Sequence, residues 1–340
     1  MEEQAGFILA LRRHLVDNWA AYCLPGESTN IAYRIRQAPK GRSAEKMRFV
    51  SLWFQDNPEE PFAAAKWTLN QGMFDKIRQE YRFMLWLREV KNVQFVPKPL
   101  GCPEISGVPV LIERAVQGRS FAHSLIALEA AQDSKKFSQY FEEILLKAEE
   151  ILKQIQDPLE PVSKQEVLEE VDSFFFRAEK ILEWSEEKSR EIKRVLNSFP
   201  FGTIPGSGDA LLIGAFAPRN ILTGSSGTFL IDLEFSRRSK LAFLDSLFFT
   251  FSLFKFLHKS FEENSEETVS FFQEKILKGE NEFGKRFELF LRSRSILKEN
   301  FEWYWLIFLL YEVVYLDSIS DLFLPSYRFL FNCLIDLLIG

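Results

Sequence analysis

Cysteine is scarce in this sequence. Only three occur among 340 residues, Cys23, Cys102 and Cys333, and no two of them are close together in the chain. This spacing excludes a local zinc motif and a paired disulfide framework. The pattern is typical of a reducing compartment, where we expect the three thiols to serve as small packing residues.

Long apolar runs and a targeting segment are also lacking. The most apolar stretch, Trp303 to Tyr311, is nine residues long before Glu312 interrupts it, whereas a helix needs about 20 apolar residues to span a bilayer. The chain starts with Met-Glu-Glu-Gln, which is not the basic and then apolar pattern of an export signal. We therefore expect no membrane span and a cytoplasmic location. The 35 phenylalanines leave two alternatives, a packed core or an aromatic patch for peripheral membrane contact.

An excess of positive charge is the third absence. The chain has 42 Lys and Arg residues against 48 Asp and Glu residues, a net charge of -6. This balance, without a stripe of Lys and Arg, argues against a nucleic-acid interface. With 46% hydrophobic and 26% charged residues, the chain has the composition of an ordinary globular protein. It is long enough for one two-lobed domain or two small ones.

Residues 210–235 combine strand and turn signals with two polar side chains that suit a cation. The runs 210–213 and 228–231 are apolar and β-like, and the sequence GSSG at 224–227 favours a hairpin turn. Asn220 precedes the short apolar pair Ile221-Leu222, and Asp232 follows the second run. A hairpin would therefore bring an amide and a carboxylate together. These oxygens suit Mg²⁺, which takes few protein ligands and completes its shell with phosphate and water.

The same stretch resembles the catalytic segment of the aminoglycoside phosphotransferase and choline kinase group of kinase-like enzymes. That group has the pattern H-G-D-[LF]-x-P-x-N-[IL]-L and, after a turn, I-D-[FW]-E. Here residues 213–222 read IGAFAPRNIL and residues 231–234 read IDLE. The resemblance implies that Asn220 and Asp232 bind Mg²⁺. It also reveals two losses, because Ile213 replaces the histidine and Ala215 replaces the aspartate that would accept the proton of the substrate hydroxyl.

A lysine within a small, apolar strand pattern is the second feature. Residues 62–69 read FAAAKWTL, and burying the ammonium of Lys66 is costly unless an anion pairs with it. The helical pattern of residues 73–90 offers such an anion in Glu80. In the resembled group, a strand lysine pairs with a glutamate of this helix and contacts the α- and β-phosphates of ATP. The alternative is a solvated lysine on an edge strand and a surface glutamate.

Two further segments resemble nucleotide-binding parts of the group. Residues 24–30, LPGESTN, precede an alternating strand pattern, and small residues such as Gly26 and Ser28 let backbone N–H groups approach a phosphate. A plain turn is the alternative there. Residues 107–118 resemble the strand and hinge that end the small lobe in this group. There the backbone of Glu113 to Ala115 would face adenine.

The chain beyond the hairpin is expected to be mainly helical. Asp245 stands where the resembled group has an aspartate that braces the catalytic loop. In that group the C-terminal helices wall the acceptor-substrate site, which makes several side chains candidates for a pocket, with a packed core as the alternative. These candidates are Trp303, Trp305, Tyr311, Glu312 and Tyr315.

These observations predict an α+β protein with a two-lobed, protein-kinase-like fold. Residues 1–20 form an N-terminal helix, residues 21–115 a small β-sheet lobe with one key helix, and residues 116–340 a larger, mainly helical lobe that includes the hairpin 210–235. Residues 120–200 are expected to be helical with one break at Asp157-Pro158 and Pro161. The nucleotide would lie in a cleft between the lobes.

We expect the first of three functions, and the other two are its alternatives. The first is a protein that binds ATP and Mg²⁺ but is catalytically impaired, like a pseudokinase, because Ala215 replaces the general base. The second is an active phosphotransferase, or a transferase of another ATP moiety, that acts on a small-molecule hydroxyl and uses a different base, for which Asp209 and Glu234 are the nearest carboxylates. The third is a scaffold protein without a nucleotide. The expected partners are a nucleotide and an unidentified small molecule or protein.

Overall fold

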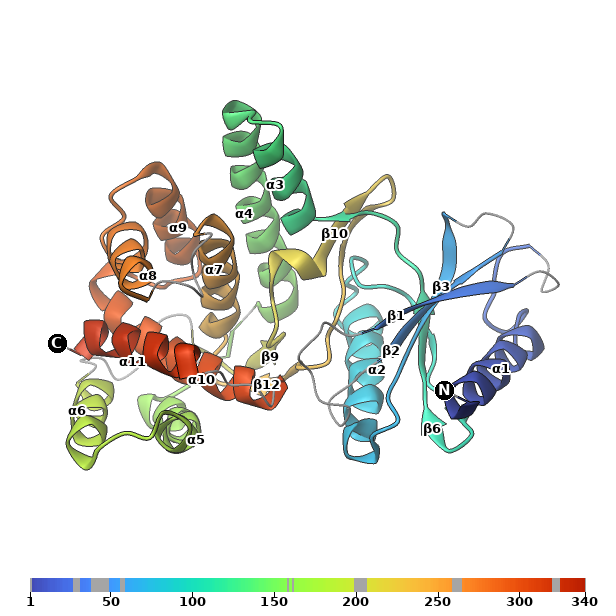
Figure 1. Ribbon diagram of the computed structural model, residues 1–340, viewed down its shortest axis with the longest axis horizontal. Coiled ribbons are helices and arrows are strands. Elements are labelled where there is room, and N and C mark those ends of the chain that lie inside the picture. The colour runs from blue at the N-terminus through green and yellow to red at the C-terminus, as the bar shows by residue number, and fades with distance from the viewer. Residues whose placement is uncertain are drawn as a thin grey trace. The chain divides into compact units, whose positions relative to one another are not determined.

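The computed structural model describes residues 2–26, 31–37, 49–55, 59–157, 159–160, 162–198, 207–258, 265–319 and 325–339. These residues form two compact units, and Figure 1 labels their helices and some of their strands. The first unit comprises Met1–Phe121 and Asn220–Phe235, and the second comprises Ala122–Arg219 and Ser236–Gly340. The first contains a small antiparallel sheet and the second is mainly helical, so the predicted α+β class is confirmed.

The first unit is built on a five-stranded antiparallel sheet in the order β1-β2-β3-β7-β4. Its strands are β1 (Ala32–Gln37), β2 (Phe49–Phe54), β3 (Pro61–Trp67), β4 (Pro99–Gly101) and β7 (Leu111–Arg114). The other elements before residue 121 are α1 (Glu2–Asp17), η2 (Gln71–Met73), α2 (Phe74–Glu89), β5 (Glu104–Ile105), β6 (Val108–Pro109) and β8 (Arg119–Ser120).

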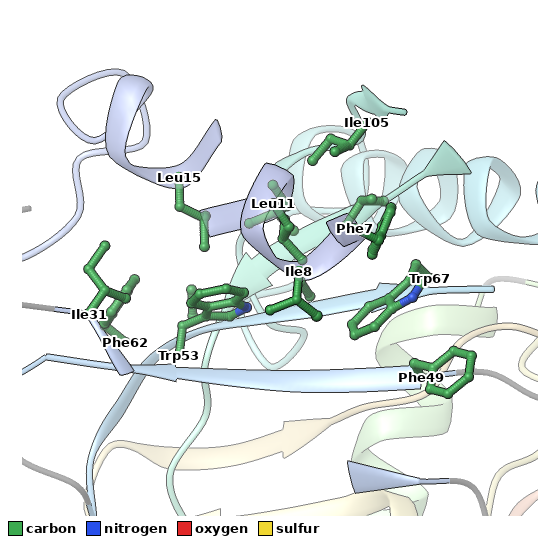
Figure 2. Packing of buried hydrophobic residues seen from close by; sticks show 14 of the residues in the cluster. Phe7, Ile8, Leu11, Leu15, Ile31, Phe49, Trp53, Phe62, Trp67 and Ile105 are labelled. Carbon is green, nitrogen blue, oxygen red and sulfur yellow. The ribbon is translucent and has the colours of Figure 1, made fainter. Parts of the chain in front are cut away.

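Helix α1 covers one face of this sheet. Figure 2 shows its apolar residues, among them Leu11 and Leu15, lying over Trp53 of β2 and Trp67 of β3. Successive side chains of a strand point to opposite faces, and every second residue of β3, from Ala63 to Trp67, belongs to this cluster. Lys66 lies between two of these residues, so its side chain is on the face opposite α1.

Helix α2 packs on the face to which Lys66 points. Its buried residues are Ile77, Glu80, Met84 and Leu87, a spacing that places them along one side of a helix. Glu80 therefore lies within an otherwise apolar stripe. This position turns its carboxylate toward the sheet rather than toward solvent.

The predicted hairpin turn joins β10 (Ile221–Gly224) to β11 (Gly227–Leu230), which pair in register from Ile221 with Leu230 to Gly224 with Gly227. Strand β10 also pairs with β8, and the Leu230 N–H donates to the Phe95 carbonyl at 2.7 Å. These bonds place residues 220–235 in the first unit. From the sequence we had expected the hairpin to belong to the helical lobe of residues 116–340.

The second unit consists of helices and one short strand pair. The helices are α3 (Phe121–Ala130), α4 (Ser134–Gln156), α5 (Lys164–Leu182), α6 (Glu186–Asn197), α7 (Phe243–Leu257), α8 (Ser265–Phe272), α9 (Glu282–Ser293), α10 (Phe301–Ile319) and α11 (Pro325–Ile339). The remaining elements are β9 (Ala210–Leu212), which pairs with β12 (Arg237–Ser239), and the short turns η3 (Pro218–Asn220), η4 (Gln273–Leu277) and η5 (Lys298–Asn300).

The helical region before residue 200 has more breaks than the single one we expected near residues 157–161. Helix α5 ends at Leu182, and its C-cap Glu183 has a left-handed φ of 55°. Helix α6 begins after Ser185, which caps it by accepting from the Lys188 N–H. A second additional break separates α3 from α4, where Asp133 is the N-cap. Among the described residues, no helix has the length and apolarity needed to cross a membrane.

Candidate functional site

Lys66 is the centre of a buried ionic cluster in the first unit. Its Nζ lies 2.8 Å from Glu80 Oε1 and 3.3 Å from Glu113 Oε1. The exposed fraction is 7% for Lys66, 1% for Glu80 and 4% for Glu113. The predicted pair of Lys66 and Glu80 is therefore formed, and Glu113 is a second carboxylate partner that the sequence interpretation had considered only for its backbone.

The pKa values of this cluster follow from burial and from the opposite charges. Burial lowers the pKa of Lys66, but the carboxylates of Glu113, Glu80 and Asp232 outweigh burial, so the net shift is upward. Burial raises the pKa of Glu113, and the nearby Lys66 ammonium opposes that rise. Lys66 is therefore a cation at neutral pH. Its charge in turn favours the ionised form of the Glu113 carboxylate.

The hairpin is tied to this cluster through Glu80. The Leu233 N–H donates to Glu80 Oε1 at 3.3 Å, the same oxygen that accepts from Lys66. At the open end of the hairpin, the Ile231 N–H donates to the Asn220 carbonyl at 2.9 Å, so Asn220 and Asp232 come from adjoining ends of the two strands. Asp232 has a φ of 66°, a left-handed conformation that Asp tolerates better than most residues.

Two oxygen-bearing side chains at this end of the hairpin fit a hard cation. Asn220 is 6% exposed and Asp232 is partly buried. No group of three or more His, Cys, Asp or Glu that could hold a metal occurs in the part of the chain that the structure describes. An amide and a carboxylate are nevertheless sufficient for Mg²⁺ when phosphate and water supply its other ligands.

The segment expected to face adenine is part of the sheet. The Arg114 N–H donates to the Lys98 carbonyl at 2.8 Å, and the Ala115 N–H donates to the Phe62 carbonyl at 3.3 Å. Both N–H groups are thus already bonded. The polar atom without a hydrogen bond here is Glu113 Oε2, which is buried and has no such partner among the described residues.

Of the two residues expected to approach a phosphate, only Gly26 can be placed. It has a φ of 64°, and a Cβ at this position would lie 2.5 Å from Gln55 Nε2. Both the backbone conformation and this close approach favour glycine. Ser28 lies outside the described residues.

The segment around Ala215 belongs to the second unit and is braced as the resemblance implied. Asp245 Oδ2 accepts from the Ile213 N–H at 2.8 Å, and Oδ1 accepts from the Gly214 N–H at 2.9 Å. The Tyr311 hydroxyl donates to the Gly214 carbonyl at 2.5 Å. Ala215 itself is 2% exposed. Hydrogen bonds to Asp245 and Tyr311 thus fix the backbone just before residue 215, which carries no carboxylate.

Replacement of Asp245 by asparagine is expected to weaken this loop. The wild-type carboxylate also accepts from Gln156 Nε2 at 2.9 Å, so its oxygens face three donors. An asparagine amide offers one acceptor oxygen, which leaves a buried N–H without a partner at a cost of about 1–3 kcal/mol in the free energy of unfolding. Hydrogen exchange of the Ile213 and Gly214 amides at pH 8 measures this loss directly.

The same variant tests the charge of Asp245. Burial raises its pKa from 3.8 to about 7, against the lowering effect of the Ile213 and Gly214 N–H bonds. Because the folded pKa is above the unfolded one, the folded state binds the proton more tightly, and its contribution to stability is lost as the pH rises from about 4 to about 7. The stability difference between wild type and Asp245→Asn should shrink over this range and stay constant above it. A difference that grows with pH would contradict the raised pKa.

The five candidate pocket residues, all on α10, are core residues in the structure. Trp303, Trp305, Tyr311, Glu312 and Tyr315 have exposed fractions of 7% or less. The Trp303 indole N–H donates to the Leu196 carbonyl, and Glu312 pairs with Lys255 at 2.8 Å. These contacts join α10 to α6 and α7. They favour the packed-core alternative over a pocket wall.

No family model matches the chain, and no curated protein matches it. Several solved structures are similar to it. The chain is similar to a choline/ethanolamine kinase family protein from Mesorhizobium loti, with 8% identity over 96% of this chain and 95% of that one and a TM-score of 0.47. It is also similar to amicoumacin kinase in complex with AMP-PNP and Ca²⁺, with 10% identity, coverage of 100% and 95% and a TM-score of 0.43. A third similar structure is an aminoglycoside-3'-phosphotransferase of type VIII, with 15% identity, coverage of 78% and 93% and a TM-score of 0.40.

By their names, the three structures are of a choline/ethanolamine kinase family protein, an amicoumacin kinase and an aminoglycoside phosphotransferase.

Proposed function

We propose that this protein binds ATP together with Mg²⁺ through Lys66, Asn220 and Asp232, and that it transfers phosphate slowly or not at all because Ala215 lacks the general base. The expected ligand is the nucleotide, with a small molecule or protein as the further partner.

One observation carries the proposal. Glu80 Oε1 accepts both from Lys66 Nζ at 2.8 Å and from the Leu233 N–H at 3.3 Å. A single carboxylate oxygen thus joins the lysine of β3 to the hairpin residue next to Asp232. Strand β3 near residue 66, helix α2 near residue 80 and the hairpin near residue 232 are held together in this way. The carboxylate of Asp232 also raises the pKa of Lys66, so its charge acts on the same ammonium.

Each residue has a role that follows from its chemistry. The Lys66 ammonium would bind phosphate oxygens as a point charge. Asn220 and Asp232 would supply an amide and a carboxylate oxygen to Mg²⁺. When bound, the ion neutralises phosphate charge and orients the polyphosphate. Glu80 would position Lys66 and the hairpin without contacting the nucleotide.

The absent base accounts for the proposed impairment. A positioned general base contributes about 10²–10⁴-fold to a rate, and residue 215 is an alanine. Asp209, one of the carboxylates considered as a replacement, pairs with Lys240 at 3.4 Å. This partly exposed ion pair lies within the second unit, so the Asp209 carboxylate has a cationic partner there.

A thermal-shift titration with ATP and Mg²⁺ tests the proposal. The wild type should be stabilised by about 2.7 kcal/mol at a ligand concentration of 100 times Kd, whereas Asp232→Ala should lose this stabilisation. Asp75→Ala is the matched control, because Asp75 belongs to the same unit and its side chain is 98% exposed. It should respond like the wild type.

Other outcomes would select the remaining functions. Formation of ADP and a phosphorylated product with amino-sugars, sugars or amino-alcohols would indicate an active phosphotransferase. A melting temperature that does not change with ATP and Mg²⁺ would contradict nucleotide binding and favour a scaffold.

A further inference from the structure

We propose that Glu113 competes with the phosphates of the nucleotide for Lys66, and thereby lowers nucleotide affinity and makes binding strictly dependent on Mg²⁺. This inference rests on the proposed function, because it concerns the same lysine.

The two carboxylates that hold Lys66 are bound differently. Glu80 Oε1 is 2.8 Å from Lys66 Nζ and also accepts from the Leu233 N–H, so it links two elements. Glu113 Oε1 is 3.3 Å from the same Nζ, and its other oxygen is buried without a hydrogen bond among the described residues. Glu113 thus makes the longer contact and joins no second element, so its displacement from Lys66 leaves the hairpin attached.

The number of N–H donors on Lys66 makes the Glu113 carboxylate and the nucleotide phosphates competitors. A lysine ammonium has three N–H donors, and two of them point toward Glu80 and Glu113. A polyphosphate that binds Lys66 through more than one oxygen must take a donor from one of these carboxylates. Glu113 is the one that gives it up, because its contact is the longer and ties no second element.

The local charge explains the dependence on the cation. Three carboxylates, of Glu80, Glu113 and Asp232, act on the single ammonium of Lys66. Lys66, Glu80 and Glu113 are buried, so solvent and salt screen their charges weakly. A free polyphosphate would meet an excess of negative charge here, whereas its Mg²⁺ complex carries less charge of the same sign. Removal of the Glu113 charge should reduce the requirement for the ion.

Calorimetric titration of ATP into the full chain, with Mg²⁺ and with EDTA, tests this role. Glu113→Gln keeps the shape and can still accept from Lys66, but it removes the charge. The variant should bind Mg²⁺-ATP about 10- to 100-fold more tightly than the wild type, and it should bind ATP measurably in EDTA, where the wild type should not. Glu113→Met has a similar volume and no acceptor oxygen, and it should also bind Mg²⁺-ATP more tightly than the wild type. It replaces the glutamine variant if that variant folds poorly.

Two further variants separate this role from a general effect of charge. Glu104→Gln removes the same charge from β5 of the same unit, where the side chain is 63% exposed, and should leave affinity within about 2-fold of the wild type. Glu80→Gln alters the other carboxylate on Lys66 and should weaken binding, opposite in sign to Glu113→Gln.

The results distinguish this inference from the proposed function. Wild-type binding that Glu113→Gln leaves unchanged or weakens overturns the role of Glu113 and leaves the nucleotide site intact. If neither the wild type nor Glu113→Gln binds ATP with Mg²⁺, the role of Glu113 and the proposed nucleotide site are both overturned.

Discussion

Replacing Lys66 by methionine is expected to lower the free energy of unfolding of the first unit by about 3–5 kcal/mol, the usual cost of leaving buried charges without their partner. Methionine fills much of the space of the lysine stem but supplies no cation. Glu80 and Glu113, which are 1% and 4% exposed, would then face each other without the ammonium that pairs with both. Hydrogen exchange of the amides of β3 and α2 gives the stability of this unit separately from the other.

Two comparisons establish the cause of that loss. Lys98→Met removes an exposed lysine of the same unit, and we expect a change within about 0.5 kcal/mol. The triple variant Lys66→Met, Glu80→Leu and Glu113→Leu replaces all three charges by apolar groups and should recover much of the stability, because buried ion networks are seldom better than well-packed apolar side chains. A Lys66→Met variant as stable as the wild type would show that the carboxylates are neutral or solvated.

The ionic pair at the centre of the site could be predicted because burial imposes a requirement that is visible in the sequence. A lysine after Phe62-Ala63-Ala64-Ala65 cannot be buried alone, and Glu80 is the residue within the following helical pattern that meets this need. The structure confirms the contact at 2.8 Å. The same rule would have identified Glu113, a charged residue that follows Leu111-Ile112 in a strand. We had instead assigned this segment a role for its backbone, which carries no side-chain signal.

The hairpin shows both what local signals can predict and what they cannot. The turn at Gly224 to Gly227 was predicted from its residues, and β10 and β11 pair across it. The partner of β9 was not predicted, because β9 and β12 have three residues each and are far apart in the chain. Pairing of such short, distant strands depends on the surrounding helices rather than on their own residues. The unit to which the hairpin belongs was missed for a similar reason, since its bonds are to Phe95, β8 and Glu80.

Truncation of Leu11 to alanine in α1 is expected to destabilise the first unit by about 2–5 kcal/mol, the range for removal of a fully buried leucine side chain. Leu11 has no exposed surface and lies in the cluster that includes Trp53 and Trp67 (Figure 2). The cavity would open between α1 and the face of the sheet opposite Lys66, so the loss comes from packing and not from the ionic cluster. Hydrogen exchange of the β2 and β3 amides measures it.

Leu9 is the matched control, because it is a leucine of the same helix with an exposed fraction of 66%. Leu9→Ala should change stability by no more than about 0.5 kcal/mol. The comparison also bears on the site, because β3 carries Trp67 on the face packed against α1 and Lys66 on the other face. If α1 fixes β3 through this packing, Leu11→Ala should speed exchange of the Lys66 amide while Leu9→Ala leaves it unchanged. Equal effects of the two variants would mean that α1 stabilises the sheet through its backbone and ends rather than through its buried face.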